Sequence, residues 1–152
     1  MTYSANKTGI SWEFINQFSF HNPPEIVLLR SPEVQKKYSL HSQELKRNNC
    51  SVANFLRNKF FPRGDKDVKF IITPNQFPYD TDGGINHYLI WFNPDLESCY
   101  WIGNFQKVKE IVQEFCRLEN IDEDNSCIFF QNLECMRSVK AIPHVHIFWK
   151  KE

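Results

Sequence analysis

The spacing of apolar residues changes once along this chain, between residues 62 and 68. Before that point apolar side chains recur every three or four residues, as they do on one face of a helix. Beyond it, short runs of aromatic and β-branched residues, which are typical of strands, are separated by turn residues. A chain whose helices come first and whose strands follow favours an α+β fold with an antiparallel sheet over a doubly wound sheet.

Three helices are expected in the first part of the chain. A short amphipathic helix is predicted within residues 11–19. A second helix begins after the N-cap Ser31, with Pro32 at its first position, and a third begins after the N-cap Ser51. These segments together predict an N-terminal helical layer.

The second part of the chain predicts a β-β-α-β-β core. Strands are expected at residues 68–73, 87–92, 127–131 and 144–149. The intervening helix begins after Asn104, and its predicted core face consists of Val108, Ile111, Val112, Phe115 and Leu118. Residues 122–125 are expected to form a polar turn, and residues 99–102 fit either an extended or a helical segment. The resulting prediction is an antiparallel sheet of about four or five strands with one packed helix.

The length of 152 residues fits a single domain over residues 1–152. We expect a loose stretch at residues 1–10, a mainly helical layer at 11–62 and the β-β-α-β-β core at 66–150. Lys and Arg number 18 and Asp and Glu also number 18, so the chain has no net charge. This balance argues against general nucleic-acid binding and against binding to a membrane surface, because both favour a basic protein.

Targeting signals are not apparent in the sequence. No apolar run approaches the roughly 20 residues of a membrane span. The N-terminal residues lack the charged start and apolar stretch of a signal peptide. We therefore expect a cytoplasmic protein, and a nuclear location stays open.

The chain has five cysteines, and no two of them show the Cys-x-x-Cys spacing. An odd number of cysteines without a signal peptide argues against a disulfide framework, so we expect reduced thiols. Cys127 and Cys135 could form a zinc site with His144 and His146, and this remains an alternative. The leading expectation is that the protein uses no metal and no cofactor.

His144 and His146 are the residues of this sequence most suggestive of chemistry. Residues two apart on a strand point to the same face, so the two imidazoles are expected to lie side by side. Burying them without partners is costly. They are useful where one ring attacks or protonates a phosphate and the other orients it. The alternative is a pair of partly solvated histidines at the edge of the sheet.

The surrounding motifs resemble the histidine-triad superfamily of nucleotide hydrolases and transferases. The segment from Pro143 to His146 follows Asn132, Ser138 and Val139, and a strand beginning with His87-Tyr-Leu-Ile lies upstream. The resemblance implies that His146 is the nucleophile, that His144 is its neighbour, and that Asn132 and Ser138 are polar contacts. Two features depart from the pattern: Phe148 occupies the third triad position, and Lys140-Ala-Ile142 is inserted.

A second resemblance covers residues 28–150. Its three blocks begin at Arg30-Ser-Pro-Glu, at Phe77-Pro-Tyr-Asp80 with Ile85-Asn-His-Tyr-Leu-Ile-Trp91, and at Asn132-Leu-Glu-Cys-Met-Arg-Ser-Val139 with Pro143-His-Val-His146. They are similar to the N-acetylglucosamine-induced protein family, a domain of unknown function. The family's name implies a link to amino-sugar metabolism, and hence a nucleotide sugar as a ligand.

These observations give two functional hypotheses. The first is a histidine-triad-like phosphohydrolase or transferase acting on a nucleotide or nucleotide sugar. The second is a non-catalytic module on the same scaffold that binds a phosphorylated metabolite or a protein partner. The expected site residues are His146 and His144 for catalysis, and Asn132, Ser138, Arg137, His87 and Lys140 for ligand binding. A homodimer remains open.

Overall fold

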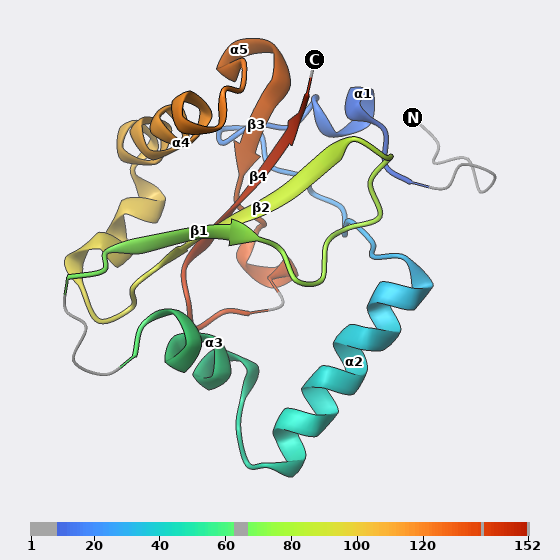
Figure 1. The fold of residues 1–152 in the computed structure, drawn as a ribbon, viewed down its shortest axis with the longest axis vertical. Helices are drawn as coiled ribbons and strands as arrows, with labels where there is room; N and C mark the ends of the chain where they lie inside the picture. The colour runs from blue at the N-terminus through green and yellow to red at the C-terminus, as the bar shows by residue number, and fades with distance from the viewer. Residues whose placement is uncertain (1–8, 63–66, 138, 152) are drawn as a thin grey trace.

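A four-stranded antiparallel sheet with the strand order β1-β2-β4-β3 lies at the centre of the fold (Figure 1). The computed structural model describes residues 9–62, 67–137 and 139–151. The strands are β1 (Phe70–Pro74), β2 (Ile85–Phe92), β3 (Cys127–Phe130) and β4 (His144–Lys150). The helices are α1 (Trp12–Ile15), α2 (Pro32–Arg47), α3 (Val52–Phe60), α4 (Phe105–Glu119) and α5 (Glu123–Ser126), with short 3₁₀ helices η1 (Glu97–Gly103) and η2 (Glu134–Met136). The predicted α+β class is confirmed.

Polar N-caps fix where the three long helices begin. The side chains of Ser31, Ser51 and Asn104 each accept a hydrogen bond from the backbone N–H three residues later. These bonds satisfy donors that the first helical turn leaves without an intrahelical partner. The starts of α2, α3 and α4 were therefore readable from the sequence.

One face of the sheet packs against α4. The residues buried between them are Ile90, Phe92, Val108, Ile111, Val112, Phe115, Cys116, Cys127, Val145, Ile147 and Trp149. Successive strand residues point to opposite faces. The residues that alternate with these along β2 and β4 therefore lie on the other face, and they include the three histidines of the strands.

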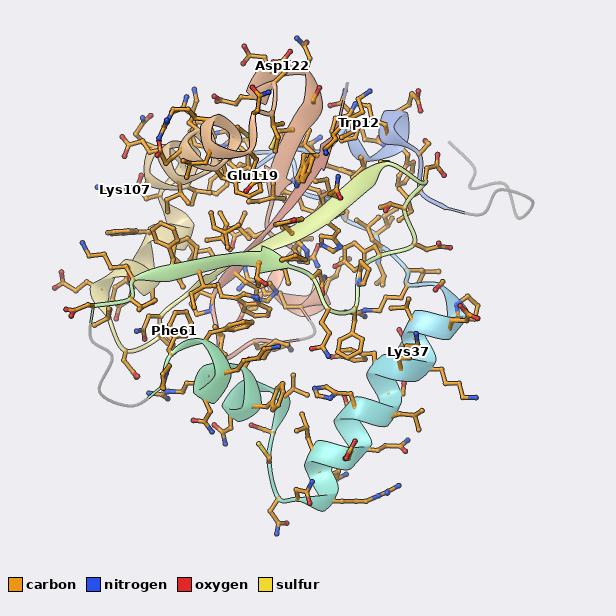
Figure 2. All side chains as sticks on the ribbon, viewed as in Figure 1. Trp12, Lys37, Phe61, Lys107, Glu119 and Asp122 are labelled. Atoms are coloured by element: carbon orange, nitrogen blue, oxygen red, sulfur yellow. The ribbon has the colours of Figure 1, made fainter. Side chains whose placement is uncertain are left out.

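The second face of the sheet has two separate apolar covers. The first cover comes from the N-terminal segment, where Ile10, Ile15 and Leu28 pack with Phe130 and Phe148. The second comes from α3 and the residues around it, which pack against Leu89 and Trp91. Phe61, labelled in Figure 2, directly follows α3 and is buried in this second cover. His87, His144 and His146 lie on this same face of the sheet.

Three expectations from the sequence are corrected. Leu118 is 68% exposed, because it lies at the edge of the apolar stripe of α4, where Cys116 is buried in the last turn. Residues 123–126 form α5, which Asp122 caps by accepting backbone hydrogen bonds, in place of a simple turn. Residue Ile10 is buried and pairs with Thr81, so the end of the expected loose stretch is ordered.

Residues 1–8, which form most of the expected loose stretch, lie outside the described residues. Residues 99–102 fitted either an extended or a helical segment, and in the structure they belong to the 3₁₀ helix η1. Within the described ranges, no helix is both long enough and apolar enough to cross a membrane.

Two residues of α4, one inside its apolar stripe and one at the edge, give a matched test of this packing. We expect Ile111→Ala to lower the free energy of unfolding by about 2 kcal/mol or more, because Ile111 is 9% exposed and packs in the core. Leu118→Ala removes a side chain of similar size from the same helix and is expected to change stability by less than about 0.5 kcal/mol. Urea unfolding of both variants measures the difference, and equal losses would contradict the observed burial.

Candidate functional site

A hydrogen bond between two buried histidines joins the central strands. His87 lies on β2 and His146 on β4, and the antiparallel register makes them diagonal neighbours on one face. Nε2 of His87 lies 2.8 Å from Nδ1 of His146. The two residues are only 5% and 4% exposed. The strand pairing therefore brings the two rings together, and the segments that cover this face isolate them from water.

Tyr79 and Asn132 close this pair into a ring of hydrogen bonds. The backbone N–H of Tyr79 donates to Nδ1 of His87 at 3.2 Å. The side-chain amide of Asn132 lies 3.3 Å from Nε2 of His146 and 2.7 Å from the hydroxyl oxygen of Tyr79. We refer to Tyr79, His87, Asn132 and His146 as the buried polar cluster. Its hydrogen bonds run from the backbone N–H of Tyr79 through His87, His146 and Asn132 to the hydroxyl of the same tyrosine.

The backbone donor fixes the position of each proton on the two rings. Because an N–H of the backbone can only donate, Nδ1 of His87 must be the unprotonated nitrogen. Neutral His87 then carries its proton on Nε2 and donates it to Nδ1 of His146. Neutral His146 consequently carries its proton on Nε2, which faces Asn132. Both nitrogens of His146 are thus engaged inside the protein.

The amide of Asn132 must present an acceptor to this last proton. The two ends of a side-chain amide exchange places by a half-turn about χ2, and the hydrogen-bond network decides between the two orientations. We infer that the oxygen of Asn132 faces His146 and also accepts from the Tyr79 hydroxyl. With that orientation every bond in the buried polar cluster has one donor and one acceptor.

Burial keeps these imidazoles uncharged. Loss of hydration lowers the pKa of His87 to about 3, and the positive charge of Arg30 adds to this effect. The same loss of hydration holds the pKa of His146 well below its usual value, helped by its neighbour His87. Burial also lowers the pKa of His144, although its hydrogen bond to the Ile142 carbonyl opposes the shift.

His144 has a different hydrogen-bond pattern from His146. Its Nδ1 donates to the backbone carbonyl of Ile142 at 2.9 Å. In the neutral ring Nε2 is therefore the nitrogen with the free lone pair. No described residue forms a hydrogen bond to that nitrogen. The ring packs against Trp91, with 4.7 Å between centroids, and edge-on against His146.

A pocket of about 80 Å³ lies between α2, α3 and the sheet, and we call it the central pocket. His144 and His146 line it on the side of the sheet, and Arg30 and Lys59 contribute positive side chains. Among the described residues that line this pocket there is no Asp or Glu. The central pocket therefore has a positive electrostatic character. Of the two strand histidines that line it, only His144 keeps an imidazole nitrogen without a partner among the described residues.

The structure brings some of the predicted site residues together and separates others. His87, Asn132 and His146 meet in the buried polar cluster, and His144 lies next to it. Asn132, however, lines a different hollow from the two strand histidines. The predicted residues thus surround one buried cluster and do not all face a single pocket.

The remaining predicted contacts come from the segment before β4. Arg137 donates through Nε to the backbone oxygen of Asn132 at 2.9 Å and through Nη2 to the side chain of Gln131 at 3.2 Å. Lys140 is exposed and does not line the central pocket. Ser138 lies outside the described residues.

Two residues of the site were not expected from the sequence. Tyr79 closes the buried polar cluster, and Arg30 stacks on Tyr38 with 4.3 Å from its guanidinium carbon to the ring centroid. Both residues belong to motifs noted in the sequence. Tyr79 lies in the motif from Phe77 to Asp80, and Arg30 begins the first block of the second resemblance. Neither motif specifies that its residue turns toward the strand histidines.

The alternative zinc site is not assembled. Cys127 pairs with Trp149 across β3 and β4, so it points to the α4 face of the sheet, opposite the histidines. Cys135 is exposed. Within the described ranges no three His, Cys, Asp or Glu side chains come close enough to hold a metal ion. The described cysteines are all free thiols.

The proton positions give a direct spectroscopic prediction. We expect long-range ¹H–¹⁵N spectra at neutral pH to show the Nε2–H tautomer for His87 and His146 and the Nδ1–H tautomer for His144. These forms follow from the donors at Tyr79 and the acceptor at Ile142. An Nδ1–H tautomer at His146 would contradict the direction of the buried polar cluster.

The lowered pKa values predict a loss of stability in mild acid. The unfolded chain binds protons on these histidines below about pH 6.5, whereas the folded chain does not, down to about pH 3 for His87. Stability should therefore be complete above that range and fall by up to about 1.4 kcal/mol per pH unit for each buried histidine. Urea unfolding between pH 7.5 and 5.5 measures the slope.

Replacing one buried histidine gives the control for this experiment. His144→Phe removes one of the three proton-binding differences, so the slope should fall by about a third. His21→Gln, at an exposed position, leaves the buried imidazoles unchanged. A wild-type stability that stays constant over this range would rule out neutral burial of the three rings.

Comparisons with known proteins agree with the fold described above. Across 95% of this chain and 86% of the other, the structure is similar to the crystal structure of HTC1, with a TM-score of 0.63 and 18% sequence identity. At this identity the likeness concerns the fold alone. No curated protein matches the chain. Residues 11–150 match the family described as Protein of unknown function (DUF3605), and the chain therefore belongs to that family.

Proposed function

We propose that this protein binds a small phosphorylated metabolite, with the phosphate in the central pocket. The observation that carries the proposal is the charge of the pocket wall. Arg30 and Lys59 line it, and the described lining residues include no carboxylate. A phosphate would therefore meet two cations without like-charge repulsion, and Arg and Lys are the usual phosphate partners in proteins.

The dimensions of the central pocket suit the phosphate end of a ligand. Its volume of about 80 Å³ holds a few small groups, since one water needs roughly 10–15 Å³ on this measure. The aromatic walls are already in contact with one another. Trp91 packs on Phe60 and His144, and Tyr38 carries the Arg30 guanidinium. A nucleotide base or sugar would consequently extend outward from the pocket.

The geometry favours binding over turnover at His146. Its two nitrogens are held by His87 and Asn132, so no lone pair is free to attack phosphorus. The third triad position is filled by Phe148, which is fully buried and stacks on His87 at 4.3 Å between centroids. Both features support the non-catalytic hypothesis drawn from the sequence.

A second candidate function is supported by His144. Its Nδ1–H bond to the Ile142 carbonyl orients the ring and leaves Nε2 as the lone-pair nitrogen beside the central pocket. In a phosphohydrolase or transferase acting on a nucleotide or nucleotide sugar, this nitrogen would attack phosphorus as the leaving group departs. Water or an acceptor would then take the phosphoryl group from the histidine. The histidine-triad resemblance assigns this role to His146, whereas the hydrogen bonds favour His144.

Thermal shift with a phosphate series tests the first proposal. We expect inorganic phosphate, an amino-sugar phosphate and UDP-N-acetylglucosamine to stabilise the protein, and N-acetylglucosamine without phosphate to have no effect. A ligand at 100 times its dissociation constant adds about 2.7 kcal/mol. Lys59→Met should weaken binding about tenfold, whereas Lys37→Met, at an exposed position outside the pocket, should not. No stabilisation by any phosphate compound would refute the proposal.

Incubation with the ligands that bind tests the second candidate. If His144 is a nucleophile, product should form with wild type and be lost with His144→Asn, and phosphorus NMR of the quenched protein should show a phosphohistidine. His146→Asn is not a useful control here, because it breaks the buried polar cluster. If a ligand stabilises the protein fully but no product forms, the catalytic candidate is refuted and the non-catalytic binding module is the function.

A further inference from the structure

A second hollow is lined by Tyr79 and Arg30, and we call it the lateral pocket. It has a volume of about 260 Å³ and lies between the segment 26–30 and the residues around η2. We propose that the lateral pocket binds a small amphiphile with an anionic head and an aliphatic chain. This site is separate from the phosphate site of the proposed function, although Arg30 lines both pockets.

Two arginines without carboxylate partners provide the anion site. Arg30 and Arg137 are both half-buried and both line the lateral pocket. Neither has an Asp or Glu partner among the described residues, whereas Arg57 and Arg117 are paired with carboxylates at the surface. A partly buried cation that lacks a counter-charge is costly, and an anion from outside would offset that cost.

Both guanidinium groups keep donors free for a ligand. Arg30 uses Nε to bond the Phe77 carbonyl, and no described residue bonds its two Nη groups. Arg137 uses Nε and Nη2 for the backbone of Asn132 and the side chain of Gln131, which leaves Nη1. The bonds already made hold the two side chains in place, so the remaining donors are preorganised.

The other residues that line the lateral pocket include both apolar and polar side chains. Ile26 and Val27 line it while 51% and 64% exposed, and Met136 faces the same hollow. Exposed neighbouring aliphatic side chains are typical of a surface that binds apolar groups. Tyr79 and Asn132 line the same hollow. An anionic head at the arginines would thus place an aliphatic chain along residues 26–28.

Met136 gives a specific probe of this site. The chain has two methionines, Met1 and Met136, so protein labelled with ¹³C at the methionine methyl groups gives two signals. Met136→Leu assigns them. We expect decanoate, kept below its micelle-forming concentration, to shift the Met136 signal along a saturable curve. Decanol lacks the anionic head and acetate lacks the chain, so neither should reproduce the shift. Decyl phosphate distinguishes a phosphate head from a carboxylate head.

Variants in the lateral pocket separate specific binding from adsorption. Arg137→Gln should weaken decanoate binding about tenfold, and Arg137→Lys should retain part of the affinity, which guards against a simple folding defect. Val27→Ser changes an exposed position and should weaken binding by shortening the apolar surface. Arg47→Gln, at an exposed arginine outside this pocket, should leave binding unchanged.

Three results would overturn the inference. They are an unmoved Met136 signal, an equal shift with decanol, and equal decanoate binding by wild type, Arg137→Gln and Val27→Ser. Failure of this site and failure of the proposed function are distinguishable, because Lys59 lines the central pocket but not the lateral pocket, whereas Met136 lines the lateral pocket but not the central pocket. Phosphate-dependent stabilisation that depends on Lys59 would stand even if decanoate did not bind.

Discussion

The hydrogen bond between His87 and His146 is the interaction on which the second face of the sheet depends. It joins the two central strands through side chains, in addition to their backbone ladder. Burying two imidazoles is tolerable only because every polar atom of the pair has a partner. Tyr79 and Asn132 supply those partners, and their own positions are fixed in turn. The loop before β2 and the end of β3 are thereby attached to the middle of the sheet.

The same cluster separates two kinds of histidine. His146 is committed to internal bonds through both nitrogens, whereas His144 uses only Nδ1 and keeps its other nitrogen beside the central pocket. Two residues that are adjacent on one face of a strand thus have different chemical capacities. The difference comes from what surrounds each ring, since the residue type and the strand are the same. For this reason we favour binding as the function. If the protein also catalyses a reaction, we expect His144 to be the residue responsible.

Much of the fold was predictable from the sequence, because local signals determine it. The caps Ser31, Ser51 and Asn104 fix where helices begin, and short runs of aromatic and β-branched residues between turn residues place the four strands. The prediction was wrong for Leu118, since periodicity does not show how far a helix stays in contact with the sheet.

For the candidate site, spacing alone placed His144 and His146 on one face. It could not place Tyr79 or Arg30, because their contacts depend on how a loop and an extended segment pass over that face. The positions of the protons on the histidine rings could not be predicted either, because they depend on the backbone N–H of Tyr79, which is remote in the sequence from His146.

The two apolar covers of the second face have a consequence for motion. They belong to different clusters, one built by the N-terminal segment and one by α3, and the three histidines of the sheet lie on the face that both of them cover. The two clusters share no buried residue. We therefore expect each cover to open as its own cooperative unit, at a free energy below that of global unfolding. A ligand could enter this face by the brief release of one cover while α4 and the opposite face remain intact.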